Sequence, residues 1–213
     1  MDDAMSMIRC TNKVYLKELL ESHDLPMPKS LVMNEKDDLS KAERRLDYPM
    51  VVKIPDGSFS RGVHKVSNRE ELKQIAAKLF EETELILLQE FMPTDFDWRV
   101  GVLDGKPLFV SQYLMAKKHW QIVKHEADGR AIEGGFSTMA VADAPADVVE
   151  MAVKAASLIG NGLYGVDLKQ NEHGVFIIEI NDNPNMDTNI EGTVLKDAMW
   201  RAVLQWYLDR LQP

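Results

Sequence analysis

The spacing of apolar residues predicts the helices and strands of this chain. Apolar positions three or four residues apart are typical of helices, whereas short β-branched or alternating runs are typical of strands. The helical pattern covers residues 11–22, 35–46, 69–81, 146–159 and 193–211. The strand pattern covers residues 29–33, 50–54, 63–66, 85–90, 97–103, 106–115, 164–169 and 175–181. Residues 1–10 carry little pattern.

Turn and cap residues separate these elements. Ser67 is expected to cap the helix that begins at Arg69. Asp104-Gly105 is a strong hairpin signal, and residues 171–174 form a short connection between the last two strands. Residues 116–136 are polar and irregular, and a loop of this length in a compact domain is usually functional or disordered.

The order of the predicted elements favours an α+β fold. It reads α-β-α-β-β-α-β and then β-β-loop-α-β-β-α, without an internal repeat. We expect two lobes with mixed or antiparallel sheets, residues 1–90 and residues 91–213, joined by a hinge near Gln89–Asp97. A chain of this length can form one sizeable domain or two small lobes that share a cleft.

The strand of residues 175–181 contains a carboxylate inside an apolar run. Because strand side chains alternate between faces, Glu179 and Asn181 share one face, and Phe176, Ile178 and Ile180 are expected on the other. Burying an uncompensated carboxylate costs on the order of several kcal/mol, so a basic partner or a metal is expected. Two oxygen donors at this spacing suit a hard cation such as Mg²⁺.

Asp167 lies on the preceding strand and is a candidate neighbour of Glu179. The short connection makes the two strands antiparallel neighbours, so that Asp167 would face Glu179 and, with Asn181, complete a metal site. Like charges placed opposite each other are destabilising without a cation between them. The alternative is that Asp167 lies near a strand end and Glu179 pairs with a lysine.

Lys53 ends an apolar strand and is followed by a polar loop, residues 55–62, that is rich in serine and glycine. A lysine and backbone N–H groups in such a loop can surround phosphates. The loop matches neither G-x-x-x-x-G-K-[S/T] nor G-x-G-x-x-G. The alternative is an ordinary hairpin loop, because the two strands that flank it are expected to pair.

Two further segments carry candidate binding residues. Gln89-Glu90-Phe91-Met92 can offer backbone groups to the edge of an adenine and apolar side chains to its face, or it can be the end of a core strand. Asp97 and Arg99 share a strand face and could hold a ribose hydroxyl and a phosphate or carboxylate, or they could form an internal ion pair. The basic run that contains Lys117 is more often a solvated face.

Composition narrows the functional classes. The net charge of −9 argues against a general nucleic-acid binder, because phosphate backbones require a basic face. The single cysteine, Cys10, excludes an internal disulfide and a cysteine-based zinc cluster and fits a reducing compartment. The N-terminus is acidic and lacks an apolar segment, and no apolar run reaches transmembrane length. We therefore expect a cytoplasmic protein that does not bind a membrane.

The order of these signals resembles the ATP-grasp fold, and most closely its RimK-type branch of carboxylate–amine ligases. The resemblance extends from about Thr11 to the end of the chain, and its most specific part is Ile178-Glu-Ile-Asn-Asp-Asn-Pro-Asn185. The matching features, in order, are Asn12-Lys13, Val51-Val52-Lys53, the loop Ser58–Gly62, Gln89–Met92, Asp97-x-Arg99, and Asp167 twelve residues before Glu179-x-Asn181.

This resemblance implies that ATP lies between two α+β lobes. Lys13 and Lys53 would hold its phosphates, with Ser60, Arg61 and Gly62 closing over them. Gln89, Glu90, Phe91 and Met92 would contact the adenine, and Asp97 would contact the ribose. Asp167, Glu179 and Asn181 would hold Mg²⁺, or Mn²⁺ in its place.

The chemistry that the resemblance implies is amide formation through an acylphosphate, with release of ADP. Phosphoryl transfer depends on positioning and charge neutralisation, which lysines, an arginine and Mg²⁺ can supply. Arg99 and Lys117 would steady the acylphosphate or the acceptor, and Asn183 would touch a substrate carboxylate. An amino acid, a peptide or a protein terminus is the expected substrate.

Two departures from the family pattern leave alternatives. Many RimK-type ligases carry an Arg-Ser-Asn run after a central aromatic residue, but Trp120 is followed here by Gln121-Ile122, so the basic role is expected at Lys117 or Lys118. Family members usually carry a preceding domain that helps to bind substrate. The chain could therefore be an ATP-binding module that lacks independent catalysis. Apolar residues on more than one face of the last helix suit contact with a missing N-terminal domain or a homo-oligomer, which also allows an interaction protein.

Overall fold

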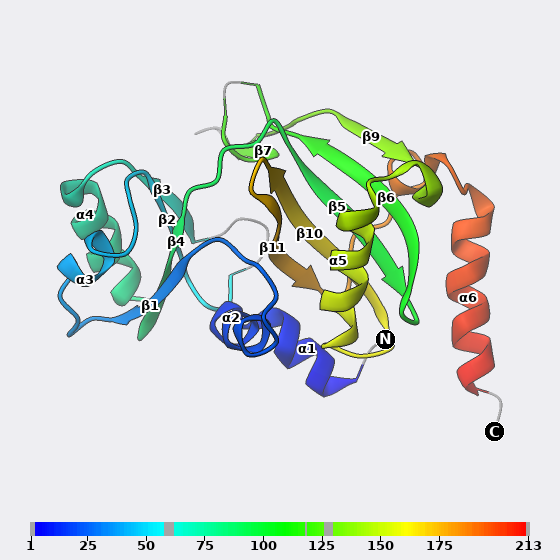
Figure 1. Cartoon of the computed structure of the whole chain (residues 1–213), viewed down its shortest axis with the longest axis horizontal. Helices are drawn as coiled ribbons and strands as arrows, with labels where there is room; N and C mark the ends of the chain where they lie inside the picture. The colour runs from blue at the N-terminus through cyan, green and yellow to red at the C-terminus, as the bar shows by residue number, and fades with distance from the viewer. Residues whose placement is uncertain (1–2, 58–61, 118, 126–129, 212–213) are drawn as a thin grey trace. The chain divides into compact units, whose positions relative to one another are not determined.

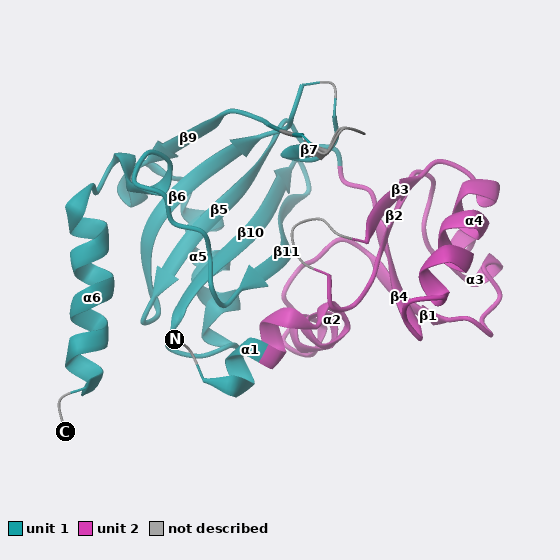
Figure 2. Ribbon diagram, turned by 180° about the vertical axis from the view of Figure 1, so that it is seen from behind, with its two compact units in different colours: residues 1–7, 93–213 teal, residues 8–92 magenta. Residues whose placement is uncertain are grey.

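The chain forms two compact units in a computed structural model that describes residues 3–57, 62–117, 119–125 and 130–211. One unit is Ile8–Met92, and the other combines Met1–Met7 with Pro93–Pro213 (Figure 2). We call them the 8–92 unit and the 93–213 unit. The boundary predicted from the sequence lies after residue 90, with the first residues in the first lobe. Among the described residues, no helix has the length and apolar character needed to cross a membrane.

The 8–92 unit is built on a four-stranded antiparallel sheet. Its strand order is β1-β4-β2-β3, and α3 and α4 lie on one face of it (Figure 1). The strands are β1 (Ser30–Asn34), β2 (Met50–Lys53), β3 (Val63–Val66) and β4 (Leu85–Glu90), and the helices are α2 (Lys13–Ser22), α3 (Ser40–Glu43) and α4 (Arg69–Phe80). The predicted hairpin around residues 55–62 is confirmed, because β2 pairs with β3 in antiparallel register.

The core of this unit forms between the sheet and the apolar stripe of α4. Leu72, Ala76 and Leu79 recur at helical spacing and are almost completely buried against strand residues such as Val52 and Leu88. Burying a side chain such as Leu72 contributes about 1.5–3 kcal/mol relative to leaving it exposed. The spacing of apolar residues therefore determines which face of α4 packs on the sheet.

The 93–213 unit is built on a five-stranded antiparallel sheet of order β11-β10-β5-β6-β9. Its strands are β5 (Phe96–Leu103), β6 (Lys106–Leu114), β9 (Phe136–Met139), β10 (Leu163–Asn171) and β11 (Gly174–Asn181), beside a two-stranded hairpin of β7 (Val123–His125) and β8 (Ala131–Glu133). Its helical segments are η1 (Val141–Asp143), α5 (Ala146–Ser157), η2 (Glu191–Thr193) and α6 (Asp197–Leu211). Helix α1 (Ala4–Thr11) contains the boundary between the residues of the two units.

Helix α5 covers one face of the five-stranded sheet and leaves the other face to polar side chains. The helix lies across the strands in Figure 1, and Val148, Ala152 and Ala155 form its buried stripe. On the strands beneath it, Leu168 and Ile177 are fully buried. The residues that alternate with these point to the opposite face, where the candidate functional side chains of this unit lie.

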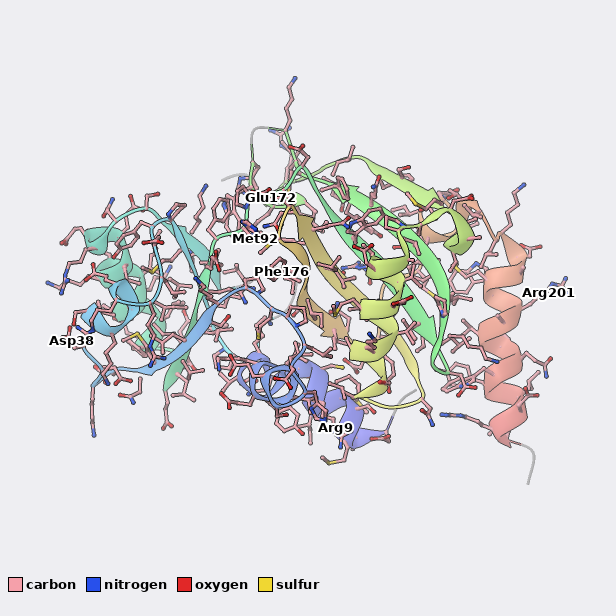
Figure 3. All side chains as sticks on the ribbon, in the orientation of Figure 1. Arg9, Asp38, Met92, Glu172, Phe176 and Arg201 are labelled. Carbon is pink, nitrogen blue, oxygen red and sulfur yellow. The ribbon has the colours of Figure 1, made fainter. Side chains whose placement is uncertain are left out.

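A β-bulge changes which residues of β11 share a face. Asp167 pairs with Glu179, but the next residue of β10 pairs with Ile177, so that Ile178 has no partner in the register. Ile177 and Ile180 are buried, whereas Phe176 is half-buried. The prediction that Phe176 and Ile180 share a face was wrong, because the extra residue reverses the alternation between them. Phe176 lies on β11 in Figure 3.

Helix α6 packs one side against the sheet of its unit. Val203 and Trp206 are buried with Leu103 of β5, whereas Leu204 and Leu208 are exposed. Arg201 points away from the sheet (Figure 3). The predicted start at Thr193 was too early, because η2 and a left-handed residue, Lys196 (φ 51°), precede the helix. Apolar residues therefore do occupy more than one face of α6.

The helix predicted over residues 35–46 is reduced to one turn, α3. The backbone N–H of Lys36 donates to the side chain of Asn34 at 2.9 Å, and that of Ser40 donates to Asp38 at 2.9 Å. Such side-chain bonds offer the backbone an alternative to helix, and apolar spacing does not register them. Asp38 lies beside α3 (Figure 3).

Two other local predictions were wrong, and one helix was not predicted. Residues 4–11, which carry little apolar pattern, form α1. Helix α4 is capped by Asn68 instead of Ser67, because the Asn68 side chain accepts from the N–H of Glu71 at 3.0 Å. Residues 116–136, predicted as an irregular loop, contain the β7–β8 hairpin and the first residue of β9.

Candidate functional site

Three candidate side chains lie on neighbouring strands of the five-stranded sheet. Asp167 on β10 is directly opposite Arg99 on β5 and directly opposite Glu179 on β11. Residues opposite each other in antiparallel strands project to the same face with short Cβ separations. The predicted antiparallel pairing that brings Asp167 to Glu179 is therefore confirmed, and Asp167 lies within its strand rather than at its end.

Arg99 and Asp167 form a bidentate ion pair. Arg99 Nε donates to Asp167 Oδ1 at 2.7 Å, and a terminal guanidinium nitrogen donates to Asp167 Oδ2 at 2.8 Å. The two side chains are only 16% and 18% exposed, so that solvent screens the pair weakly. The attraction of Asp167 raises the pKa of Arg99 above its ordinary value, which burial alone would lower. The pair holds Asp167 in one orientation on the polar face.

Asn181 completes the oxygen-rich group predicted from the sequence. It lies on the same face as Glu179, and its Nδ2 donates to Asp167 Oδ2 at 3.3 Å and to the carbonyl of Gly165 at 3.4 Å. Among the described residues, no three His, Cys, Asp or Glu side chains are grouped for a metal. The group here offers two carboxylates and an amide, and its amide would have to turn to present oxygen to a cation.

Asp97 is paired with a lysine instead of with Arg99. Lys169 donates to Asp97 Oδ1 and, at 2.6 Å, to the hydroxyl of Thr94, which itself donates to Asp97 at 3.2 Å. Burial raises the pKa of Asp97, although Lys169 lowers it. The alternative of an internal ion pair between Asp97 and Arg99 is not what forms, because each residue has a different partner across the strands.

A second buried network lies beside Arg99 and was not predicted from the sequence. Tyr113 donates a hydrogen bond to Glu191, which is 1% exposed and also accepts from the N–H of Asp187 at 2.7 Å. The guanidinium of Arg99 lies 5.0 Å from the ring centroid of Tyr113. Burial and the bond to Glu191 raise the pKa of Tyr113. In the sequence Glu191 resembles an ordinary polar residue before the last helix, so no pattern identified it.

In the 8–92 unit, Lys53 is held by a chain of neutral groups. Its Nζ donates to Gln89 Oε1 at 2.7 Å, Gln89 Nε2 donates to Ser30 at 2.9 Å, and Ser30 donates to the carbonyl of Pro28 at 2.7 Å. Lys53 and Gln89 are 9% and 3% exposed. Because β2 and β4 are neighbours, Lys53 and Gln89, 36 residues apart, meet on one face of the sheet.

Lys13 is held at the start of α2. Its backbone N–H donates to the carbonyl of Pro55 at 3.0 Å, and its ammonium group donates to the carbonyl of Gly57. Asn12 caps the helix by accepting from Tyr15 and also donates to Asp56 at 2.8 Å. Lys13 therefore contacts Pro55 and Gly57, and Lys53 ends the strand that precedes them. These residues begin the loop for which phosphate binding is predicted.

The other described residues of this predicted site lie directly before β3 and at the end of β4. Gly62 has a φ of 68°, which favours glycine, and its carbonyl accepts from the N–H of Ile54 at 3.1 Å. Ser60 and Arg61 lie outside the described residues. The N–H of Glu90 donates to the carbonyl of Lys29 at 2.8 Å, Lys65 lies 4.6 Å from the ring centroid of Phe91, and Met92 is buried.

The structure does not bring Lys117 and Asn183 into these networks. Both residues are exposed, and Asn183 follows the end of β11. The adjacent Pro184 is buried against Gly165, where a Cβ would lie 2.6 Å from the proline ring. This close approach fixes the chain after β11 but leaves the roles predicted for Lys117 and Asn183 as predictions.

Comparison with known families supports the resemblance seen in the sequence. The family described as the D-Ala–D-Ala ligase C-terminus matches residues 19–194, which is more than half of the chain. The chain belongs to this family of ATP-grasp domains. The predictions of an ATP-grasp fold of the α+β class and of an ATP-dependent carbon–nitrogen ligase are confirmed at the level of the family.

Curated relatives are similar over most of this chain. It is 23% identical over 197 residues to the alpha-aminoadipate–LysW ligase LysX of Saccharolobus solfataricus, which covers 89% of this chain and 67% of the relative. It is 26% identical over 182 residues to the D-alanine–D-alanine ligase of Lacticaseibacillus casei, and the match covers 82% of this chain and 49% of that relative. It is 25% identical over 196 residues to a probable alpha-L-glutamate ligase of Thioalkalivibrio sulfidiphilus, and the match covers 87% of this chain and 60% of that relative.

Solved structures of ligases share the fold. The D-alanine–D-alanine ligase of Bacillus anthracis superposes with a TM-score of 0.77 at 17% identity, covering 97% of this chain and 70% of that one. The structure of the same ligase complexed with ATP has a TM-score of 0.72. The chain thus spans about half to seven tenths of the length of these relatives.

Proposed function

We propose that this chain catalyses ATP- and Mg²⁺-dependent formation of an amide bond between a carboxylate and an amine. The observation that carries the proposal is the facing pair of Asp167 and Glu179, with Asn181 on the same face of the sheet. Two carboxylates side by side repel each other, so a fold that keeps them together implies a positive group between or beside them. Arg99 supplies part of that charge.

The donor set fits a hard divalent cation. Asp167, Glu179 and Asn181 would hold Mg²⁺, or Mn²⁺ in its place, through carboxylate and amide oxygens. Because Arg99 binds both oxygens of Asp167, it would orient that carboxylate toward the cation rather than compete for the transferred phosphate. When bound, the cation would neutralise phosphate charge during transfer.

Residues of the 8–92 unit would bind the nucleotide. Lys13 and Lys53 are held by neutral oxygens beside the loop of residues 55–62, an arrangement suited to phosphates, and Ser60, Arg61 and Gly62 would contribute from that loop. The segment Gln89–Met92 would contact the adenine. Gln89 would contact only the edge of the adenine, because the side-chain amide of Gln89 already binds Lys53 and Ser30.

Asp97 is proposed to receive the ribose from the 93–213 unit. Its carboxylate already accepts from Lys169 and Thr94, and it keeps further acceptor capacity for a hydroxyl group. This role requires the pair with Lys169 to remain in place, because an unpaired carboxylate at this buried position would be costly.

The proposed reaction has two steps. An oxygen of the substrate carboxylate bonds to the γ-phosphorus of ATP as the bond to ADP breaks. The amine nitrogen then bonds to the acyl carbon of the acylphosphate, inorganic phosphate leaves, and the nitrogen loses a proton to a base. Positioning and charge neutralisation account for most catalysis of such transfers. Lys117 and Asn183, which are exposed, are proposed to contact the substrates.

The substrates are proposed to be amino acids or peptides, including a protein terminus. Support comes from the names of relatives, which include an alpha-aminoadipate–LysW ligase, a D-alanine–D-alanine ligase and a probable alpha-L-glutamate ligase. A second candidate is an ATP-binding module without independent catalysis. It is favoured by the fact that this chain covers only 49% of one relative and 67% of another.

ADP release with mass spectrometry of the products tests the proposal. Pairs of amino acids and peptides are incubated with the chain, ATP and Mg²⁺, and we expect ADP and an amide to appear together. Lys53→Met should lower the rate at least about 100-fold, as loss of a group that stabilises transferred charge typically does. Lys73→Met, which removes an exposed lysine from α4, should not change the rate. Nucleotide binding without ADP release from any pair would favour the binding module instead.

A further inference from the structure

A cavity of about 440 Å³ lies within the 93–213 unit beside Arg99 and Tyr113. Its volume is in the range of roughly 300–1,000 Å³ that is typical of small-molecule sites. Six of its thirteen lining residues are apolar. The apolar lining residues are Leu114, Ile122, Val123, Phe136, Met186 and Ile190. Of these, Leu114 and Phe136 are 41% and 45% exposed, which is unusual for large apolar side chains and leaves their surface available to a ligand.

Backbone hydrogen bonds hold the wall of this cavity in place. The N–H of Leu114 donates to the carbonyl of Gly135 at 2.8 Å, and the N–H of Gly134 donates to the carbonyl of Ile122 at 2.8 Å. Gly134 passes so close to β6 that a Cβ there would lie 1.8 Å from the carbonyl oxygen of Leu114. The segment before β9 is therefore fixed to the end of β6, and the cavity does not depend on a ligand to form.

The opposite wall is held by the buried carboxylate of Glu191. Its two oxygens accept from Tyr113 of β6 and from the backbone of Asp187, which ties the segment after β11 to the sheet. Asp187 is exposed at the cavity, and its carboxylate accepts from the N–H of Asn189 at 2.6 Å. Glu191 thus acts as a positioning residue that sets Asp187 at the edge of the cavity.

The formal charge of the lining is negative. Among the described lining residues, Arg99 is the only cation, and the lining also contains the carboxylates of Glu133, Asp187 and Glu191. The positive charge of Arg99 is further offset by its bidentate pair with Asp167. A negatively charged ligand group would therefore be repelled from this cavity, whereas a positively charged amine would be attracted.

We propose that this cavity binds the amine substrate, and that the substrate is an amino acid or peptide whose amine lies next to an apolar side chain. The inference rests on the proposed ligase function, and it adds the substrate class. The apolar walls would receive the side chain, while Glu133 and Asp187 would attract the ammonium form of the amine. An acidic acceptor such as glutamate would place its carboxylate among carboxylates and would bind poorly.

Calorimetric titration of the full chain tests the proposal without requiring turnover. The probes are Leu-Leu amide, N-acetyl-Leu-Leu amide and L-glutamate at pH 6.5, where an α-amino group of pKa about 7.7–8.0 is mostly protonated. We expect Leu-Leu amide to bind at least about tenfold more tightly than either of the others, which corresponds to about 1.4 kcal/mol.

Variants assign the binding to the cavity. Asp187→Asn preserves the acceptor for the N–H of Asn189. The double variant that adds Glu133→Gln should lower the affinity for Leu-Leu amide at least about tenfold. Phe136→Ser, at an exposed position, should weaken it by a similar factor. Glu150→Gln removes an exposed carboxylate from α5, on the other face of the sheet, and should leave the affinity unchanged.

The outcomes separate this proposal from the proposed function. Tighter binding of L-glutamate, or equal affinity in the Asp187→Asn and Glu133→Gln double variant, would overturn the cavity's assignment even if ADP is released with other substrates. If no pair of substrates releases ADP but Leu-Leu amide binds as expected, the site is supported as an amine site and the ligase function fails.

Discussion

The two units hold their candidate charged side chains with different kinds of partner. In the 93–213 unit, Arg99 and Lys169 form buried ion pairs with carboxylates on neighbouring strands. Within the 8–92 unit, the described side-chain hydrogen bonds of Lys13 and Lys53 include one to a backbone carbonyl and one to a side-chain amide. A neutral acceptor orients an ammonium group without cancelling its charge, whereas a carboxylate cancels it.

This difference matches the roles proposed for the two units. Phosphate binding requires positive charge, which neutral partners preserve. A cation site requires carboxylates that stay close together before the cation arrives, and a fixed guanidinium lowers the cost of that arrangement. The partner of a charged residue therefore indicates its use better than the residue type does. The difference should be measurable as stability, with the largest loss expected for the buried ion pair and the smallest for the pair open to solvent.

The ion pair of the 93–213 unit should show the largest effect. Arg99→Leu leaves Asp167 buried beside Glu179 without its partner, and we expect a loss of about 3–5 kcal/mol in the free energy of unfolding. Chemical denaturation measures this, with Arg201→Leu on the exposed face of α6 as the control. The double variant with Asp167→Leu should recover most of the loss. A loss below about 1 kcal/mol in the single variant would contradict a strong buried pair.

The neutral chain of the 8–92 unit should show an intermediate effect. Gln89→Leu removes the acceptor of Lys53 and the donor to Ser30, and leaving such buried groups without this partner costs about 1–3 kcal/mol. The exposed Gln74→Leu on α4 is the matched control and should change stability little. If Gln89→Leu were as stable as Gln74→Leu, the amide would not be what positions Lys53.

An ion pair in the 8–92 unit that is open to solvent should show the smallest effect. Lys17 bonds to Glu21 at 2.7 Å, but the Glu21 side chain is 49% exposed, so Glu21→Gln should cost less than about 0.5 kcal/mol. Burial lowers the pKa of Lys17, but the hydrogen bonds to Glu21 and Glu18 together raise it by more, so the net shift of the pKa is upward.

That upward shift determines the pH dependence of the pair. A raised lysine pKa means that the contribution to stability is fully present below the pKa of the unfolded lysine and is lost as pH rises through the folded value. The effect of Glu21→Gln in thermal unfolding should therefore be the same at pH 6 and pH 8. A clear difference between these pH values would show that another group titrates with the pair.

The sequence predicted contacts that local connections impose. Asp167 and Glu179 face each other because only a tight turn separates β10 from β11, and that turn determines the register. The pairing of Arg99 with Asp167 was not predictable in this way, because the two residues are 68 positions apart and meet only if β10 pairs with β5. Strand order in a sheet depends on the packing of the whole unit, which a pattern along the chain does not encode.

The other differences have local physical causes. One extra residue at the bulge reversed the faces of β11, and alternation alone cannot detect such an insertion. Side chains of Asn34 and Asp38 bound the backbone in the place of a helix. Glu191 was missed because its partner, Tyr113, lies 78 residues away on β6, and nothing near it in sequence indicates burial.

Binding of Mn²⁺ in the presence of a non-hydrolysable ATP analogue, followed by electron paramagnetic resonance, tests the central claim that the polar face of the 93–213 sheet holds the divalent cation. Glu179→Gln removes one proposed ligand, and Glu172→Gln removes an exposed carboxylate from the turn of the same hairpin. Mutating a residue that only supports a metal ligand typically lowers metal affinity about 10–100-fold. Glu179→Gln, which removes a proposed ligand itself, should therefore lower the affinity for Mn²⁺ at least about 100-fold, whereas Glu172→Gln should keep the wild-type affinity. Equal affinity in the Glu179→Gln protein and the wild type would contradict the account.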